Sequence, residues 1–130
     1  MARVERFEDL IAWQKARVLT CEVHRIARDG PLSRDFELSR QMRRAAVSIM
    51  ANIAEGFERR SPAEFAQFLN IAKASCAELR SLFYVAMDAR HWSSQSGGTM
   101  IAQAEEVSRI LSGLHASVQA RRKRATQESQ

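Results

Sequence analysis

Glycine and proline are scarce in this sequence: only five glycines and two prolines occur among 130 residues. These two residue types make most tight turns, because glycine tolerates left-handed backbone angles and proline fixes its own φ. We therefore expect few connections between long regular elements. Aromatic residues are also few, at 7%, so little aromatic surface remains to stack on nucleic-acid bases once a core is filled.

Long hydrophobic runs are absent as well. No window approaches the roughly 18 uninterrupted apolar residues of a transmembrane helix. Charged residues also occupy the N-terminal positions where a signal peptide has its apolar segment. We expect a cytoplasmic protein with no membrane partner. Its 45% apolar and 27% charged residues are ordinary for a single globular domain.

Residues suited to metal binding are isolated from one another. Cys21 and Cys76 each fall within an apolar helical pattern, so both are predicted to be buried free thiols. A disulfide is not expected in a reducing cytoplasm. Cys21 and His24 have helical spacing, but no further ligands accompany them, and zinc needs four positions. We predict no metal and no cofactor.

Catalytic motifs are missing too. The sequence contains no Glu-x-x-His pair of the di-iron bundles, no Gly-rich phosphate loop and no His-Glu-x-x-His. Glu55 and Glu78 could act as paired carboxylates across two helices, but ion pairing with Arg43 or Arg44 fits better. We predict that the protein is not an enzyme and has no small-molecule substrate.

Four segments with helical periodicity account for almost the whole chain. Asp9 is the expected N-cap of the first, and Gly30-Pro31 ends it. The second begins at Asp35 and is expected to stop at Gly56. The third begins at Ser61-Pro62-Ala63-Glu64, a capping box with proline at the first helical position. A flexible loop is predicted over 93–98, followed by Thr99 as the cap of the fourth.

Helices of this length with short connections pack as antiparallel neighbours. The expected fold is all-α, an antiparallel up-down-up-down four-helix bundle over residues 1–120. Residues 121–130 are expected to form a basic, disordered tail, because Arg121, Arg122, Lys123 and Arg124 stand there against Glu128 alone. Such a tail fits a polyanion such as nucleic acid, or serves only solubility.

The second segment carries two distinct stripes at helical spacing. The apolar stripe consists of Leu38, Met42, Ala45, Ile49 and Ile53. The polar stripe consists of Gln41, Arg44, Ser48, Asn52 and Glu55. Hydrogen-bonding groups of both signs in one row are suited to a network between helices or between subunits. The pattern therefore indicates assembly more than chemistry.

Several motifs together resemble a known family. They are Phe7-Glu-Asp-Leu10, Trp13-Gln-Lys-Ala16, Gln41-x-Arg-Arg-Ala-Ala-x-Ser-Ile49, Asn52-Ile-Ala-Glu-Gly56, Phe65-x-x-Phe68-Leu69-x-x-Ala72 and Ser75-x-x-Glu78. The sequence thereby resembles, over residues 7–120, the ribosomal S23-like four-helix bundle proteins of intervening sequences in bacterial ribosomal RNA genes. The same family includes the accessory variability determinant of diversity-generating retroelements. This chain departs from the family pattern at Ala74, where glycine is common, and in its arginine-rich tail.

The resemblance implies a homopentamer of bundles around a central channel. In the retroelement branch it also implies a basic surface that binds nucleic acid, and a reverse transcriptase partner. The matched polar residues are Gln41, Arg43, Arg44, Ser48, Asn52, Glu55, Ser75 and Glu78.

Two functional hypotheses follow from these observations. The first is a non-catalytic homo-oligomeric adaptor that binds RNA or DNA electrostatically, without sequence specificity. Its candidate contacts are Arg40, Arg43, Arg44, Arg59, Arg60, Arg121, Arg122, Lys123 and Arg124. The alternative is a protein–protein scaffold without a nucleic-acid role, in which these arginines pair with Glu55, Glu58 and Glu78. In either case the structural polar network is expected to comprise Gln41, Ser48, Asn52, Glu55, Ser75 and Glu78.

Overall fold

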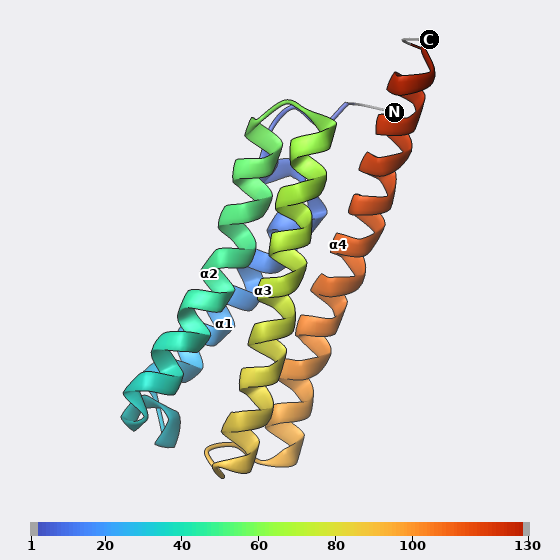
Figure 1. The fold of residues 1–130 in the computed structure, drawn as a ribbon. Helices are drawn as coiled ribbons and strands as arrows, with labels where there is room; N and C mark the ends of the chain where they lie inside the picture. The colour runs from blue at the N-terminus through green and yellow to red at the C-terminus, as the bar shows by residue number, and fades with distance from the viewer. Residues whose placement is uncertain (1–2, 129–130) are drawn as a thin grey trace.

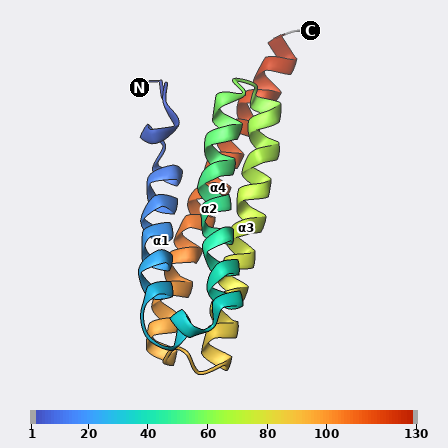
Figure 2. The same cartoon turned by 90° about the vertical axis from the view of Figure 1, so that its left-hand side faces the viewer.

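Four long helices build the protein, as a computed structural model that describes residues 3–128 shows (Figure 1). Consecutive helices run antiparallel, so the predicted all-α four-helix bundle is confirmed (Figures 1 and 2). A short 3-10 helix precedes α1, and another lies between α1 and α2. The elements in chain order are η1 (Phe7–Asp9), α1 (Ile11–Arg28), η2 (Pro31–Arg34), α2 (Phe36–Glu58), α3 (Pro62–Asp88) and α4 (Ser94–Glu128).

The core follows the periodicity of the sequence. All five residues of the predicted apolar stripe on α2 are buried. On α3, the helical spacing predicts a buried face, and the structure buries Phe65, Leu69, Ala72, Cys76, Leu79, Phe83 and Ala86 but leaves Phe68 and Leu82 half-buried. Two buried hydroxyls also join neighbouring elements: Thr20 Oγ1 donates to the Ala46 carbonyl of α2 at 3.2 Å, and Ser39 Oγ donates to the Leu32 carbonyl of η2 at 2.6 Å. These bonds satisfy polar groups that would otherwise be costly inside the core.

Capping side chains explain where α2 and α3 begin. Asp35 Oδ1 accepts from the Leu38 N–H at 3.2 Å, and Ser61 Oγ accepts from the Glu64 N–H at 3.3 Å. The Ser61 cap was predicted from the sequence, whereas Asp35 was predicted only as the start of the second helix. The second half of the expected capping box does not form. The Glu64 carboxylate instead lies 3.6 Å from the Arg59 guanidinium.

The predicted end of α2 at Gly56 is wrong, because the helix continues to Glu58. Gly56 is required by packing: a Cβ built there would lie 2.5 Å from the Phe68 Cβ of α3. Arg60 instead takes the left-handed conformation, with φ of 60°, and ends the helix. Glycine is the usual residue at such a position. Because arginine stands there instead, the sequence does not indicate that α2 ends at this point.

Two other helix starts differ from prediction. Asp9 lies in η1 and Leu10 is the N-cap of α1, so that helix begins at Ile11. The expected loop over 93–98 is mostly helical. Ser93 Oγ accepts from the Ser96 N–H at 3.1 Å, and α4 therefore begins five residues before the expected cap Thr99.

The basic segment that was expected to be a disordered tail is helical in the structure, where α4 runs on through Arg121 to Glu128. No glycine or proline follows Gly113, and Arg, Lys, Gln and Ala all favour helix. The end of α4 projects beyond the other helices (Figure 1). Residues 129–130 of the expected tail, and residues 1–2 of the expected domain, lie outside the described residues.

The two cysteines differ in environment. Cys76 is buried as predicted, its thiol donates to the Ala104 carbonyl at 3.1 Å, and burial raises its pKa to about 11. Cys21 is exposed, so the prediction of a buried thiol there is wrong. It lies beside the buried row of Ala16, Leu19 and Val23, and a neighbouring position on a helix is rotated by about 100°.

Candidate nucleic-acid interface

One end of the bundle gathers basic residues from three distant parts of the sequence. The antiparallel topology brings the N-terminal segment, the α2–α3 connection and the C-terminal part of α4 to this end (Figures 1 and 2). Arg3, Arg60 and Arg121 all line one cleft of about 150 Å³. We call Arg3, Arg59, Arg60, Arg121, Arg122, Lys123 and Arg124 the basic end cluster; all seven are exposed.

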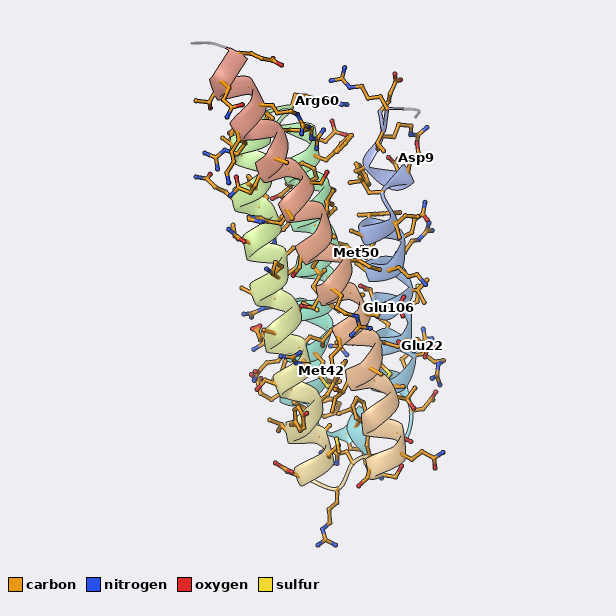
Figure 3. All side chains as sticks on the ribbon, turned by 90° about the vertical axis from the view of Figure 1, so that its right-hand side faces the viewer. Asp9, Glu22, Met42, Met50, Arg60 and Glu106 are labelled. Atoms are coloured by element: carbon orange, nitrogen blue, oxygen red, sulfur yellow. The ribbon has the colours of Figure 1, made fainter. Side chains whose placement is uncertain are left out.

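Aromatic rings hold the two arginines of the α2–α3 connection. The Arg60 guanidinium lies 4.8 Å from the Phe57 ring centroid, and its Nη2 donates to the Glu5 carbonyl at 3.1 Å. The Arg59 guanidinium lies 5.1 Å from the Phe68 ring centroid. Such stacking orders the side chain while its charge stays in water. Figure 3 labels Arg60 at this end of the molecule, with Met42 toward the opposite end.

Carboxylates partly balance the charge of these arginines. The Arg60 guanidinium lies 3.9 Å from the Glu58 carboxylate, and Arg59 has Glu64 at 3.6 Å. Both pairs are exposed, and exposed ion pairs are weak. In the C-terminal part of α4, Arg122 Nη1 donates to Gln119 Oε1 at 3.0 Å, which leaves its charge uncompensated. Among residues 3–128, Arg121, Arg122, Lys123 and Arg124 form no ion pair, whereas Arg59 and Arg60 each lie beside a carboxylate.

The predicted basic residues of α2 do not join this cluster. Arg44 precedes Arg59 by 15 residues, which is roughly 22 Å along a helix. Arg40 Nη2 donates to Glu37 Oε1 at 3.1 Å, and that hydrogen bond is the main cause of the lowered Glu37 pKa. Arg44 shares a depression of about 130 Å³ with Glu37, Arg40 and Glu78. The structure thus splits the nine predicted contacts into two groups, and acidic neighbours offset the α2 group.

The expected ion pairs of Glu55 and Glu78 with Arg43 or Arg44 do not form among residues 3–128, so that expectation is wrong. Glu55 is exposed beside Glu58 and Arg59. Arg43 is half-buried. Arg44 and Glu78 line one depression without forming an ion pair, and Glu55 lies elsewhere on α2.

The middle of the predicted polar stripe forms a network within one chain. Ser48 Oγ lies 2.8 Å from Ser75 Oγ of α3. Asn52 Nδ2 donates to the Ser48 carbonyl at 2.8 Å and to Ser48 Oγ at 3.1 Å. At the start of the stripe, Gln41 Nε2 donates to Glu37 Oε1 at 3.1 Å. Ser48, Asn52 and Ser75 therefore join α2 to α3, while Gln41, Glu55 and Glu78 stay on the surface.

The comparisons with known proteins agree with this architecture. A family model of the 23S rRNA-intervening sequence proteins matches residues 8–113. The chain belongs to this family. A crystal structure from the family of S23 ribosomal proteins, of a Bacteroides thetaiotaomicron protein of unknown function, has the same fold. Its TM-score is 0.75 at 20% identity, and the match covers 82% of this chain and 96% of that one. Among proteins of curated function, none matches this chain.

The family region includes only part of the basic end cluster. Arg59 and Arg60 lie inside the matched range, whereas Arg3 and the basic residues of 121–124 lie outside it. Sequence analysis missed Arg3, because nothing in the sequence links it to the α2–α3 connection. It also missed the stacking rings Phe57 and Phe68. The spacing of these rings from Arg59 and Arg60 matches no known sequence motif, so the stacking could not be predicted.

Other kinds of site find little support in the described part of the chain. No group of three or more His, Cys, Asp or Glu side chains gathers there as metal ligands would. No helix in that part is long and apolar enough to cross a bilayer. The basic end cluster, with seven exposed basic residues from three segments, is the candidate functional site.

Proposed function

We propose that this member of the family of 23S rRNA-intervening sequence proteins is a non-catalytic homo-oligomeric adaptor that binds RNA or DNA electrostatically. The observation that carries the proposal is the convergence of Arg3, Arg60 and Arg121 on one cleft. Three segments far apart in sequence supply one basic surface there. Phosphate groups are the natural counter-ions of such a surface, and binding of this kind needs no base-specific contact.

The outer face of α2 and α3 is the proposed contact between subunits. Val47, Ile71 and Val85 are 47%, 48% and 47% exposed. Ile71, Glu78 and Val85 repeat at intervals of seven, so they share one side of α3. Ile71 and Val85 therefore flank Glu78 on that side, and exposed apolar patches rimmed by polar residues favour association. The pentamer implied by the family resemblance would present the basic end cluster five times and strengthen its field.

A protein–protein scaffold is the alternative. It is favoured by the pairing of Arg40 with Glu37 and of Arg60 with Glu58, because paired arginines are less available to phosphate. Under this alternative, the partner is another protein and nucleic acid is irrelevant. The reverse transcriptase that the resemblance implies would be such a partner in either case.

The decisive experiment measures RNA affinity by fluorescence anisotropy between about 50 and 200 mM salt, with native mass from light scattering on the same samples. The double variant Arg121→Glu/Arg122→Glu should bind a single-stranded RNA at least tenfold more weakly, with a salt slope smaller by about 1 to 2. Its native mass should remain a multiple of 14.7 kDa, near five copies.

The matched control is Arg28→Glu/Arg34→Glu, which makes the same charge change with two exposed arginines at the opposite end of the bundle. It should leave affinity nearly unchanged. Equal losses in both variants would mean that only net charge matters and would contradict the proposed surface. Salt-independent affinity of the unaltered protein, or no binding at all, would favour the scaffold. Arg44→Glu then tests that scaffold, since loss of the oligomer would place the α2 stripe in the interface.

A further inference from the structure

A second feature lies at the end of the bundle opposite to the basic end cluster. A cavity of about 520 Å³ opens between the last turn of α1, the connection after it, the α3–α4 connection and the first turns of α4. This volume falls in the range of sites for small molecules. One side of the cavity is apolar and consists of Ile26, Leu32, Trp92 and Met100. The Trp92 ring packs on Phe83 with centroids 5.4 Å apart, so its position is fixed by the core.

Most polar groups at the cavity are already paired within the protein. Arg25 donates from Nε and Nη2 to Glu22 Oε2 at 2.9 and 2.7 Å. His91 Nε2 lies 2.9 Å from Asp35 Oδ2. At the start of α4, Thr99 Oγ1 donates to the Gln95 carbonyl at 3.1 Å. These groups already have partners within the protein, so they need no ligand to complete their hydrogen bonds.

Two residues that line the cavity, Gln103 and Asp29, have acceptors to which no group among residues 3–128 donates. Gln103 Oε1 is buried and has no hydrogen-bond partner. The Asp29 carboxylate lines the same cavity and takes part in no ion pair or hydrogen bond there. An unsatisfied buried acceptor is rare in native proteins and calls for a donor. Gln103 Oε1 is such a buried acceptor, whereas Asp29 is exposed. Asp29 is the one negative charge at the cavity that has no cationic partner among residues 3–128, since Glu22 and Asp35 are paired with Arg25 and His91.

We propose that this cavity binds a small organic cation, an ammonium group attached to an apolar or aromatic body. The ammonium would pair with Asp29, and with Gln103 Oε1 once that amide turns into the cavity, while the body would pack on Trp92 and its apolar neighbours. Ammonium groups have three donors and no acceptor, which matches two unsatisfied acceptors. A tryptophan face adds attraction for a cation. The inference is independent of nucleic-acid binding, since the cavity and the basic end cluster lie at opposite ends.

The test uses Trp92 as its reporter. The full-length Trp13→Phe variant leaves Trp92 as the remaining tryptophan, because the chain has two. The probes are 2-phenylethylamine and 3-phenylpropionate, which share an aromatic body and differ in the sign of their charge. We expect the amine to change Trp92 fluorescence saturably, with a dissociation constant on the order of 1 mM or tighter for so small a ligand. The acid should bind at least tenfold more weakly.

Two substitutions assign the contacts. Asp29→Asn should weaken amine binding about tenfold or more, as loss of a charge-assisted hydrogen bond requires. Gln103→Leu should weaken it as well, while circular dichroism shows that the fold is kept. The control Asp88→Asn makes the same substitution at an exposed carboxylate outside the cavity and should change nothing. Equal binding of amine and acid, no saturable change with the amine, or equal effects of Asp29→Asn and Asp88→Asn would each overturn the proposal.

Discussion

The hydroxyl oxygens of Ser48 and Ser75 lie 2.8 Å apart and join the middle of α2 to the middle of α3. Asn52 adds a second donor to Ser48 Oγ. The three side chains are half-buried, so they satisfy one another where water reaches poorly. The stripe that first suggested contacts between subunits thus has its central part occupied within one subunit.

This network predicts coupled stability effects. Ser48→Ala and Ser75→Ala should each lower the free energy of unfolding by about 1 kcal/mol. The double variant should lose less than the sum, because both changes remove the same hydrogen bond. Urea denaturation of the four proteins measures the cycle. Ser81→Ala, an exposed serine on α3, is the control. Additive losses would show that the two hydroxyls do not act together.

Gly56 and Gly113 should respond to alanine with opposite signs. A Cβ at Gly56 meets Phe68 of α3, so Gly56→Ala should destabilise the protein by about 1–3 kcal/mol through overpacking. Gly113 lies inside α4 and has open space around its Cβ position. Gly113→Ala should therefore stabilise by about 0.5–1 kcal/mol. Thermal or urea unfolding of both variants measures the contrast, and a stabilised Gly56→Ala would mean that α2 and α3 are less tightly packed than described.

The contact between Asp35 and His91 predicts that the stability of the fold changes with pH in the acid range. Hydrogen bonding from His91, and then from the Leu38 N–H, lowers the pKa of Asp35 below its ordinary value. A lowered folded-state pKa stabilises the fold above the unfolded pKa, and this contribution is lost as pH falls through the folded value. Asp35→Asn keeps a capping side chain but loses the charge.

The melting temperatures of the parent and Asp35→Asn should therefore differ at pH 6 and converge below about pH 4, near the ordinary pKa of an aspartate. Differential scanning fluorimetry across this range measures the gap. A gap that stays constant down to pH 3 would show that the carboxylate charge at position 35 has no role in stability.

The two thiols should react at very different rates. Cys21 is exposed, whereas Cys76 is buried with its pKa raised to about 11, and only the thiolate is nucleophilic. A disulfide reagent should label one thiol per chain in native buffer at pH 8 and two in denaturant. Cys21→Ser should abolish the native signal. Fast labelling of Cys76 in that variant would contradict the burial described for α3.

The helices and their core were predictable because the information is local. The helical spacing of apolar residues alone predicted that Leu38, Met42 and Ile53 lie in the core. Ser61 predicted the start of α3, because its hydroxyl can cap the helix. The end of α2 was not predictable, since Gly56 reads as a stop and its real role depends on Phe68, which approaches from another helix. The start of α4 was predicted at the wrong residue, because Ser93 and Thr99 are both plausible caps and the structure uses Ser93, which accepts from the Ser96 N–H.

For the candidate site, sequence supplied the charged residues but not their grouping. Arg59, Arg60 and the basic residues of 121–124 were chosen individually, and the antiparallel topology then brought them together. The separation of Arg44 from Arg59 follows from helical rise alone and was available from the sequence. The sequence does not show that Arg3 joins the basic end cluster or that Gln103 Oε1 is left without a donor. Both depend on which segments meet in three dimensions.

The helical form of the segment after Gln119 decides what shape of polyanion can use its charge. Successive residues of a helix are rotated by about 100°, so Arg121, Arg122, Lys123 and Arg124 point in four directions around the axis of α4. A straight duplex lying along one side can touch about two of them at once. A strand that bends around the helix, or a folded RNA with a pocket, can reach all four. Curvature in the partner, more than its length or its sequence, would then govern how tightly this end is held.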